Sequence, residues 1–218
     1  MRYPLTTFVP IELIISTSSV IICDIKKMSH AGSAFLAYFY FDFKDTEKQD
    51  SRALLSSLLV QLSDQSDIFF DTLFSLYSAY KLGSEIPTGD SLAECLRDML
   101  MIRRQVPVYL VIDGLDECPN DSGIPSSREK VLELVKVLVE LRLPNLRICT
   151  TSRPEFDIHT TLKPLVTQQI SLHDESGQKQ DIIDYVTSVV HSDQKMKKWR
   201  EVEKNMVVEK LSEKADGM

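Results

Sequence analysis

Two short polar segments of the sequence carry the residue types that could do chemistry. The first is an acidic turn, Asp113-Gly-Leu-Asp116-Glu117, which directly follows an apolar run. A carboxylate at the end of a buried strand suits a hard cation such as Mg²⁺, which takes oxygen ligands and keeps several waters beside nucleotide phosphates. A second carboxylate nearby, Asp116 or Glu117, could orient or deprotonate an attacking water. Acidic turns are also common for purely structural reasons, because Asp and Gly favour turns.

The second polar segment is Thr150-Thr-Ser-Arg-Pro154, in which Arg153 stands 40 residues after Asp113. An arginine at a strand end could reach a phosphate, although an arginine before a proline is also frequent in ordinary surface turns. The two segments together are far more specific than either alone. A glycosidase fits less well, because the adjacent Asp116 and Glu117 would not face each other across a sugar ring. An unrelated metal enzyme would need further His or carboxylate ligands at close spacing.

The elements expected around these segments alternate between strands and helices. Apolar runs predict strands, at 35–43, 107–112, 146–151 and, more weakly, 166–172. Apolar periodicity and capping residues predict helices, at 50–62, 67–82, 91–104, 126–143, 156–162, 181–191 and 195–214. Alternation of this kind predicts an α/β fold, a parallel sheet between two layers of helices. Such sheets bind ligands at the carboxyl ends of their strands, where Asp113 and Arg153 would lie.

The aromatic residues are expected to belong to the core. The strand at 35–43 is continuous in its hydrophobicity, which is typical of a strand buried on both faces. In the helix at 67–82 the aromatic side chains are expected to pack inside rather than to stack on bases: Phe69, Phe70, Phe74 and Tyr77. The single tryptophan, Trp199, is expected to pack on one face of the C-terminal helix.

Composition and charge exclude several classes of protein. The chain has 218 residues, of which 43% are hydrophobic and 26% charged, as in ordinary globular proteins. A formal net charge of −7 argues against nucleic-acid binding and against docking on anionic membranes. The four cysteines, at 23, 95, 118 and 149, are too widely spaced for zinc or a disulfide framework, so we expect reduced thiols and a cytoplasmic protein. The apolar stretch 13–23 is too short to span a bilayer and lacks the pattern of a signal peptide.

Three strings of residues together resemble the NACHT branch of signal-transduction P-loop NTPases, the STAND class, and most closely the fungal group with a nephrocystin-like N-terminal domain. The strings are Ala37-Tyr-Phe-Tyr-Phe-Asp-Phe-Lys-Asp45, Leu110-Val-Ile-Asp-Gly-Leu-Asp-Glu-Cys118 and Ile148-Cys-Thr-Thr-Ser-Arg-Pro154. The resemblance runs from about Ser18 to the C-terminus. It implies a three-layer P-loop NTPase-like fold and a NACHT-like nucleotide-switch domain of a signalling or assembly protein. In this family ADP holds the switch closed, and exchange to ATP permits assembly.

The resemblance also implies roles for individual residues. Asp113 would be the Walker B aspartate that acts on Mg²⁺, usually through water. Asp116 would be the acidic residue linked to hydrolysis, with Glu117 as its helper, and Arg153 the sensor-1 arginine that reports the γ-phosphate. The implied cofactors are Mg²⁺ and ATP or ADP. The implied partners are other proteins or further copies of the chain.

The largest departure from the family is the missing Walker A loop, G-x-x-x-x-G-K-[ST], whose amides, lysine and hydroxyl hold the phosphates and Mg²⁺. The sequence has no Gly-Lys pair, and none of its seven glycines precedes residue 32. The segment 18–28 resembles the helix that follows this loop, so the loop would lie at about residues 8 to 18. We therefore expect weak ATP binding, and the alternative function is a non-catalytic interaction scaffold with the same fold. Two explanations stay open: a gene model that has lost the loop, or a degenerate paralogue.

The family comparison also suggests how the chain is organised. Residues 1–17 are expected to be an atypical segment in place of the Walker A region, and 18–175 the NACHT-like core. Residues 176–218 are expected to be a helical extension, cut short where family members continue into repeats. The first strand of the family lies beside the sensor strand. We expect Glu12–Thr17, which is rich in Ile and Leu, to supply a substitute strand there.

Overall fold

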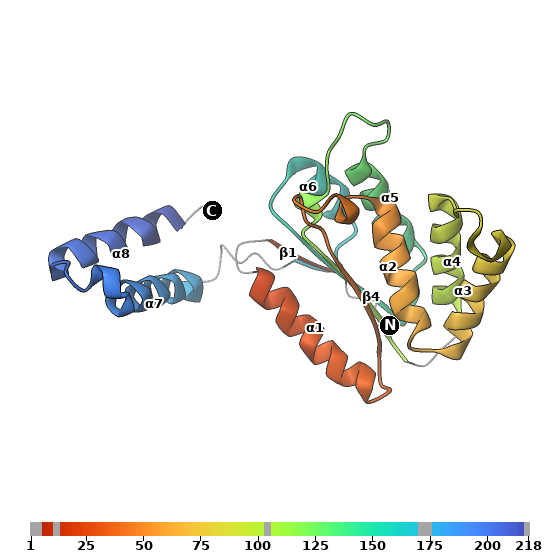
Figure 1. Ribbon diagram of the computed structural model, residues 1–218, viewed down its shortest axis with the longest axis horizontal. Helices are drawn as coiled ribbons and strands as arrows, with labels where there is room; N and C mark the ends of the chain where they lie inside the picture. The colour runs from red at the N-terminus through yellow and green to blue at the C-terminus, as the bar shows by residue number, and fades with distance from the viewer. Residues whose placement is uncertain (1–5, 11–13, 103–105, 170–175, 216–218) are drawn as a thin grey trace. The chain divides into compact units, whose positions relative to one another are not determined.

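The computed structural model of the chain describes residues 6–10, 14–102, 106–169 and 176–215. The chain divides into two units, residues 1–170 and 171–218. The first unit contains the sheet and the helices around it, and the second contains two long helices (Figure 1). In the described ranges no helix is both long and apolar enough to cross a membrane.

The first unit is built on a sheet of parallel strands, in the order β2-β3-β4-β1-β5 among the described residues. The strands are β1 (Thr6–Pro10), β2 (Phe35–Tyr40), β3 (Val108–Asp113), β4 (Leu146–Ser152) and β5 (Gln168–Gln169). Ile112 on β3 pairs with Thr150 on β4, so these two strands end side by side. The predicted α/β fold is confirmed, and both polar segments reach the same edge of the sheet.

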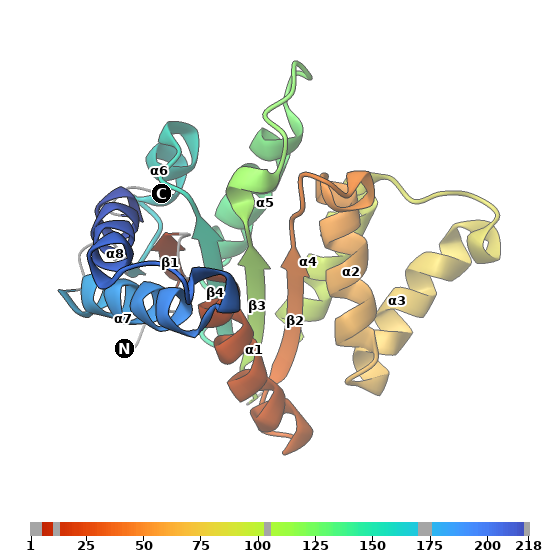
Figure 2. The ribbon, with the colours of Figure 1, turned by 60° about the vertical axis from the view of Figure 1, so that its left-hand side comes forward.

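Helices cover both faces of this sheet and complete a three-layer arrangement (Figure 2). On one face lies α1 (Ile14–His30), where Ile22 and Ile25 pack against Leu36 and Val111. The opposite face carries α2 (Ser51–Ser63), α4 (Gly89–Met101) and α5 (Ser127–Glu140). Two further helices belong to this unit. They are α3 (Asp67–Ala79), which packs against α2 and α4, and α6 (Phe156–Leu162), which follows β4.

Local capping explains where the helices next to the sheet edge begin. At the start of α5 the Ser126 hydroxyl accepts a hydrogen bond from the Glu129 N–H at 3.1 Å, and the Glu129 carboxylate accepts one from the Ser126 N–H at 2.7 Å. This reciprocal pair is a capping box. At the start of α2 the Asp50 carboxylate accepts from the Ala53 N–H at 2.7 Å. Both helices therefore begin one residue after the predicted position.

The predicted substitute strand at Glu12–Thr17 is wrong. Residues 14–17 form the first turn of α1, and Glu12 lies outside the described residues. The strand is β1, which lies earlier in the chain and pairs with β4 on one side and β5 on the other. Its place beside β4 agrees with the prediction, although its residues do not. Ile14 and Ile15 stand seven residues before Ile21 and Ile22, a spacing that puts all four on one side of a helix. This helical periodicity explains why the segment joins α1 and does not form a strand.

The prediction that all four aromatic residues of α3 lie in the core is also wrong. Phe69 is fully buried, but Phe70, Phe74 and Tyr77 are 54%, 50% and 46% exposed. The helix is apolar on more than one face, and it packs against α2 and α4 on one face only. Periodicity alone cannot tell which apolar face of such a helix is buried.

The second unit is a pair of helices, α7 (Ser176–Ser192) and α8 (Glu201–Ala215), which pack against each other. The helix predicted at 195–214 begins only at Glu201. Before it stand a short 3₁₀ turn, η6 (Gln194–Met196), and a turn at residues 197–200. Trp199 lies in this turn and is 42% exposed, so the prediction that it packs on a helix face is wrong.

The cysteines offer a direct test of this packing. Burial raises the pKa of Cys118 to about 12 and the pKa values of Cys95 and Cys149 to about 11, whereas Cys23 is exposed on α1. Because the thiolate is the reactive form, we expect a thiol reagent at about pH 8 to modify one cysteine rapidly in the native chain. Ellman's reagent should count one fast thiol in the wild type and none in Cys23→Ser. Three or four fast native thiols would contradict the packing.

Candidate functional site

Asp113 ends β3 and lies almost buried, 8% exposed, at the edge of the sheet. Its Oδ1 accepts a hydrogen bond from the Ser18 hydroxyl at 2.7 Å and another from the Thr151 hydroxyl. The Oγ1 of Thr151 in turn accepts from the Gly114 N–H at 2.9 Å. One carboxylate therefore joins α1, β3 and β4.

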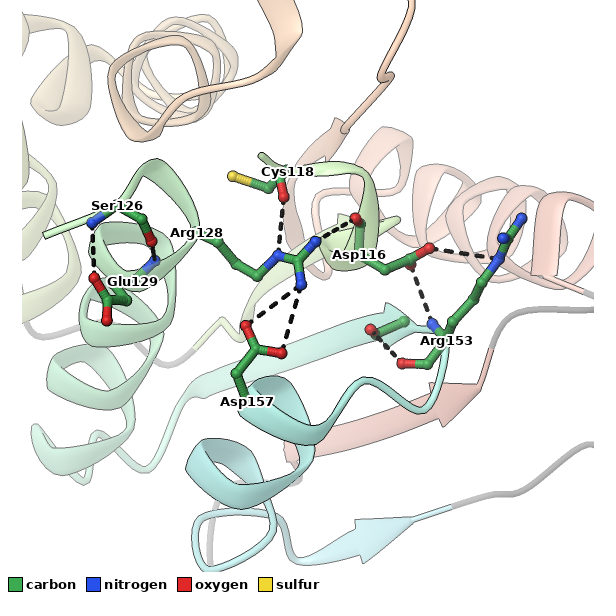
Figure 3. Close-up of polar contacts among 8 residues, drawn as sticks. Asp116, Cys118, Ser126, Arg128, Glu129, Arg153 and Asp157 are labelled. Atoms are coloured by element: carbon green, nitrogen blue, oxygen red, sulfur yellow. Dashed lines mark hydrogen bonds and ion pairs between the residues drawn. The ribbon is translucent and has the colours of Figure 1, made fainter. Parts of the chain in front are cut away.

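Asp116 is paired with Arg153 from the end of the neighbouring strand. Gly114 has a φ of 71°, a left-handed conformation that glycine adopts readily, and it starts the 3₁₀ turn η4 (Leu115–Glu117). The Arg153 backbone N–H donates to Asp116 Oδ1 at 3.1 Å, and its Nε lies 3.5 Å from Oδ2 (Figure 3). The Asp116 side chain is 8% exposed and that of Arg153 65%. The structure thus brings two of the predicted site residues together.

Glu117 contacts a different part of the chain. Its Oε2 accepts a hydrogen bond from the Phe43 N–H at 3.2 Å, which ties the acidic turn to the segment after β2. Burial raises the pKa of Glu117. Asp113, Asp116 and Glu117 therefore bind separate partners. Among the residues that the structure describes, no group of three or more His, Cys, Asp and Glu side chains is arranged to hold a metal ion.

Arg128 on α5 holds the acidic turn in place, and the sequence reasoning did not single it out. Its Nε donates to the Cys118 carbonyl at 2.9 Å and its Nη2 to the Asp116 carbonyl at 2.7 Å. Its Nη1 pairs with the Asp157 carboxylate of α6 at 3.4 Å (Figure 3). A cation in the first turn of a helix opposes the helix dipole. In the sequence, a positive charge at this unfavourable position could have indicated that Arg128 is held there by a fixed partner.

Ser18 and Thr151 are the other contributors that the sequence reasoning did not predict as site residues. Ser18 lies on α1 and Thr151 on β4, and both are buried. Serine and threonine are too common for a single one to stand out. The approach of Ser18 to Asp113, 95 positions away in the sequence, becomes visible only in the folded chain.

The residues present fit the cation of a Mg²⁺-nucleotide better than its phosphates. Ser18 and Asp113 bring a hydroxyl and a carboxylate oxygen to within 2.7 Å, the two donor types that hold Mg²⁺ in P-loop NTPases. The phosphates need a glycine-rich loop and a lysine. β1 ends at Pro10 and α1 begins at Ile14, so three residues connect them, Ile-Glu-Leu, none of them glycine or lysine. The chain therefore supplies oxygen ligands for the cation, but its connection between β1 and α1 supplies neither glycine nor lysine for the phosphates.

Asp113 should make the stability of the first unit depend on pH. Burial raises its pKa, against the lowering effect of the hydrogen bonds from Thr151 and Ser18. A carboxyl whose pKa is higher in the folded than in the unfolded state loses stability as pH rises through the interval between the two values. Between about pH 4 and about pH 7 we therefore expect the free energy of unfolding to fall more, or rise less, in the wild type than in Asp113→Asn. Urea unfolding at both pH values measures this, and an identical pH dependence in the two proteins would contradict it.

Comparisons with known proteins give one family match and weak structural likenesses. A search of curated proteins found no match. The Aeropyrum pernix ORC2 protein, in ADPNP–ADP complexes, has a TM-score of 0.48 at 9% identity, covering 87% of this chain and 46% of that chain. Drosophila ORC bound to DNA has a TM-score of 0.47 at 14% identity, covering 88% of this chain and 42% of that one. A third structure, Drosophila ORC with AT-rich DNA and Cdc6, gives 0.39 at 9% identity and covers 98% and 65%.

This chain spans less than half the length of the first two of these proteins, and likenesses at these scores carry no functional argument. The family match is more informative. The sequence profile described as "Nephrocystin 3, N-terminal" matches residues 16–153. This range begins two residues before Ser18 and ends at Arg153, so it contains Asp113 and Asp116 as well. Because the matched residues make up more than half of the sequence, the chain belongs to the nephrocystin 3 N-terminal family.

Proposed function

We propose that this chain is a NACHT-like nucleotide-switch domain of a fungal signalling or assembly protein of the STAND class. It binds ATP weakly and acts through contacts with other proteins or with further copies of itself. Family membership and the parallel sheet between two helix layers support this proposal. The core would be residues 18–175, with a helical extension at 176–218 and an atypical segment at 1–17 in place of the Walker A region. A cytoplasmic location belongs to the same proposal.

In this proposal the polar residues at the sheet edge keep the roles that the family gives them. Asp113 is the Walker B aspartate that acts on Mg²⁺, and Asp116 is the acidic residue linked to hydrolysis, with Glu117 as its helper. Arg153 is the sensor arginine for the γ-phosphate of ATP. The hydroxyls of Ser18 and Thr151 both donate to the Asp113 carboxylate. This contact supports the role of Asp113 in acting on Mg²⁺, because it places a hydroxyl beside the carboxylate.

The observation that carries the proposal is the three-residue connection between β1 and α1. A Walker A loop needs eight residues with two glycines, a lysine and a hydroxyl. Without it, most of the charge-assisted hydrogen bonds to the phosphates have no donor in this chain. Binding of ATP and ADP should therefore be weak, whatever the acidic turn contributes.

A second candidate function is a non-catalytic interaction scaffold that keeps only the fold. The observation that favours it is the contact between Asp116 and Arg153. An acid that assists hydrolysis and an arginine that senses the γ-phosphate must both face the nucleotide. Here they face each other, which stabilises the turn without a ligand.

Thermal unfolding with and without Mg²⁺-nucleotide tests the proposal. A site with a Kd of about 10 µM would raise the melting temperature of a chain of this size by roughly 5–10 °C at about 1 mM nucleotide. We expect a shift below about 1 °C with either ATP or ADP, in the wild type and in Asp113→Ala alike. A rise of several degrees that Asp113→Ala abolishes would overturn the claim of weak binding.

A further inference from the structure

One exposed surface of the first unit combines aromatic rings with unpaired carboxylates. On α3 the half-exposed rings of Phe70, Phe74 and Tyr77 follow one another. The centroids of Phe70 and Phe74 are 6.1 Å apart with planes 13° from parallel, and those of Phe74 and Tyr77 are 6.3 Å apart. Contiguous exposed apolar side chains of this kind are typical of an interaction site rather than of a surface that faces only water.

Carboxylates line a groove that adjoins this row of rings through Asp71, which stands three positions before Phe74 on α3. Asp71, Glu94 and Asp98 stand along a groove of about 450 Å³ between α3 and α4, together with the apolar side chains of Ile68 and Leu76. None of these three acids forms an ion pair within the part of the chain that the structure describes. From residue 63 to residue 100 the chain has seven acidic and two basic residues, a net charge of −5. We call this surface the acidic aromatic face.

The turn between α7 and α8, in the second unit, has the opposite charge. Residues 195–200, the basic turn, contain four cations in six positions, Lys195, Lys197, Lys198 and Arg200. All four are exposed, and Trp199 among them is 42% exposed. Arg200 pairs with Glu203 at 2.8 Å, whereas the three lysines form no ion pair with any described residue. This turn therefore offers three unpaired cations and an aromatic ring.

We propose that the basic turn of one copy of this chain docks on the acidic aromatic face of a second copy. The charges are complementary, and both surfaces carry unpartnered cations or anions beside exposed apolar groups. Lysine ammonium groups bind the faces of aromatic rings as well as carboxylates, so Phe70 and Phe74 add to the recognition. The two surfaces differ from each other, so the contact is head-to-tail and each dimer keeps one free surface of each kind.

This inference rests on the self-association that the proposed function includes, and it names the surfaces. It uses no residue of the Asp113 site and no nucleotide. An experiment can therefore find association without nucleotide binding, or nucleotide binding without association. The first result bears on the docking surfaces and the second on the proposed nucleotide site.

Sedimentation velocity of the full chain tests the contact, without nucleotide, at about 0.1 M and at about 1 M salt, where the Debye length falls from about 10 Å to about 3 Å. We expect the sedimentation coefficient to increase with protein concentration at low salt and to stay at the monomer value at high salt. A chain that stays monomeric at low salt up to about 1 mM, the limit of a very weak contact, would overturn the proposal.

Two charge reversals identify the surfaces. The first variant, Asp71→Lys with Asp98→Lys, reverses the acidic aromatic face, and the second, Lys197→Glu with Lys198→Glu, reverses the basic turn. Each alone should weaken association at least about tenfold, because like charges then face each other across the interface. Glu47→Lys with Glu140→Lys changes the net charge as the first variant does, but on exposed residues outside both surfaces, and it should associate no less than the wild type.

Mixing the two reversed variants gives the sharpest result. Each keeps one native surface, and the native basic turn of the first fits the native acidic aromatic face of the second. An equimolar mixture should therefore form dimers at concentrations where either variant alone is a monomer. If both reversed variants associate as strongly as the wild type, or if the mixture stays monomeric, the pairing of these surfaces is wrong.

Discussion

Substituting Ile11→Gly, Ser16→Gly and Thr17→Lys together is expected to tighten Mg²⁺-dependent ATP binding by at least about a hundredfold. The reason lies in the register of the chain. β1 ends at Pro10, and Ser18 is the residue whose hydroxyl contacts Asp113. Positions 11 to 18 are eight in number, the length of a Walker A loop whose last residue is the hydroxyl that binds Mg²⁺. The three substitutions complete that pattern without changing the length.

The size of the effect follows from the contacts that are added. A lysine ammonium and loop amides each give charge-assisted hydrogen bonds of about 1.5–3 kcal/mol, and two such bonds correspond to about two decades or more in Kd. The glycine at position 16 also disfavours helix, by about 1 kcal/mol relative to alanine, which helps the first turn of α1 to open into a loop. Titration with a fluorescent ATP analogue measures the change.

The matched control replaces Thr17 with methionine instead of lysine and keeps both glycine substitutions. It has the same backbone freedom without the ammonium group, so its affinity should stay near that of the wild type. Addition of Asp113→Ala to the lysine variant should remove the Mg²⁺ dependence. A folded lysine variant that binds ATP no more tightly than the wild type would show that Ser18 does not occupy the hydroxyl position of the loop.

Arg128→Ala is expected to destabilise the first unit by about 2–5 kcal/mol, because removing this buried guanidinium group leaves the two carbonyls that it contacts without a donor. The guanidinium group donates to two backbone carbonyls of the acidic turn and pairs with Asp157. Without it, the carbonyls of Asp116 and Cys118 lose their donors in an apolar setting. Arg128→Lys should recover part of the loss, since it keeps the charge but not the fork of donors.

Urea unfolding followed by near-UV circular dichroism of tyrosine measures this effect, because six of the seven tyrosines precede residue 171. Arg52→Ala is the matched control. Arg52 is exposed on α2, and its replacement should change the free energy of unfolding by no more than about 0.5 kcal/mol. A loss of less than about 1 kcal/mol in Arg128→Ala would show that the acidic turn does not depend on this side chain.

Local sequence signals predicted much of the fold. Continuous apolar runs identified β2, β3 and β4, and capping residues set the starts of α2 and α5. Once those strands are parallel and adjacent, Asp113 and Arg153 must end at one edge, because parallel strands share their carboxyl end. The short β1 was missed because five residues of Thr, Phe, Val and Pro show no usable periodicity.

What the sequence could not predict depends on contacts between distant segments. The contacts of Ser18 with Asp113 and of Arg128 with the acidic turn join residues that no local pattern connects. The exposure of Phe70 and Phe74 depends on which face of α3 meets α2 and α4, and a helix with apolar residues on more than one face does not reveal this. The break before α8 has a local origin instead: the Glu203 carboxylate accepts a hydrogen bond from the Arg200 N–H at 2.8 Å, where the helix starts.

Equilibrium titration of the purified 218-residue chain with fluorescent ATP and ADP in the presence of Mg²⁺, beside Asp113→Ala, decides whether this sheet edge holds a nucleotide. We expect no saturable binding by either protein below about 1 mM nucleotide, with both proteins folded by circular dichroism. Micromolar binding by the wild type that Asp113→Ala abolishes would contradict this expectation, and would mean that the sheet edge holds nucleotide without a Walker A loop.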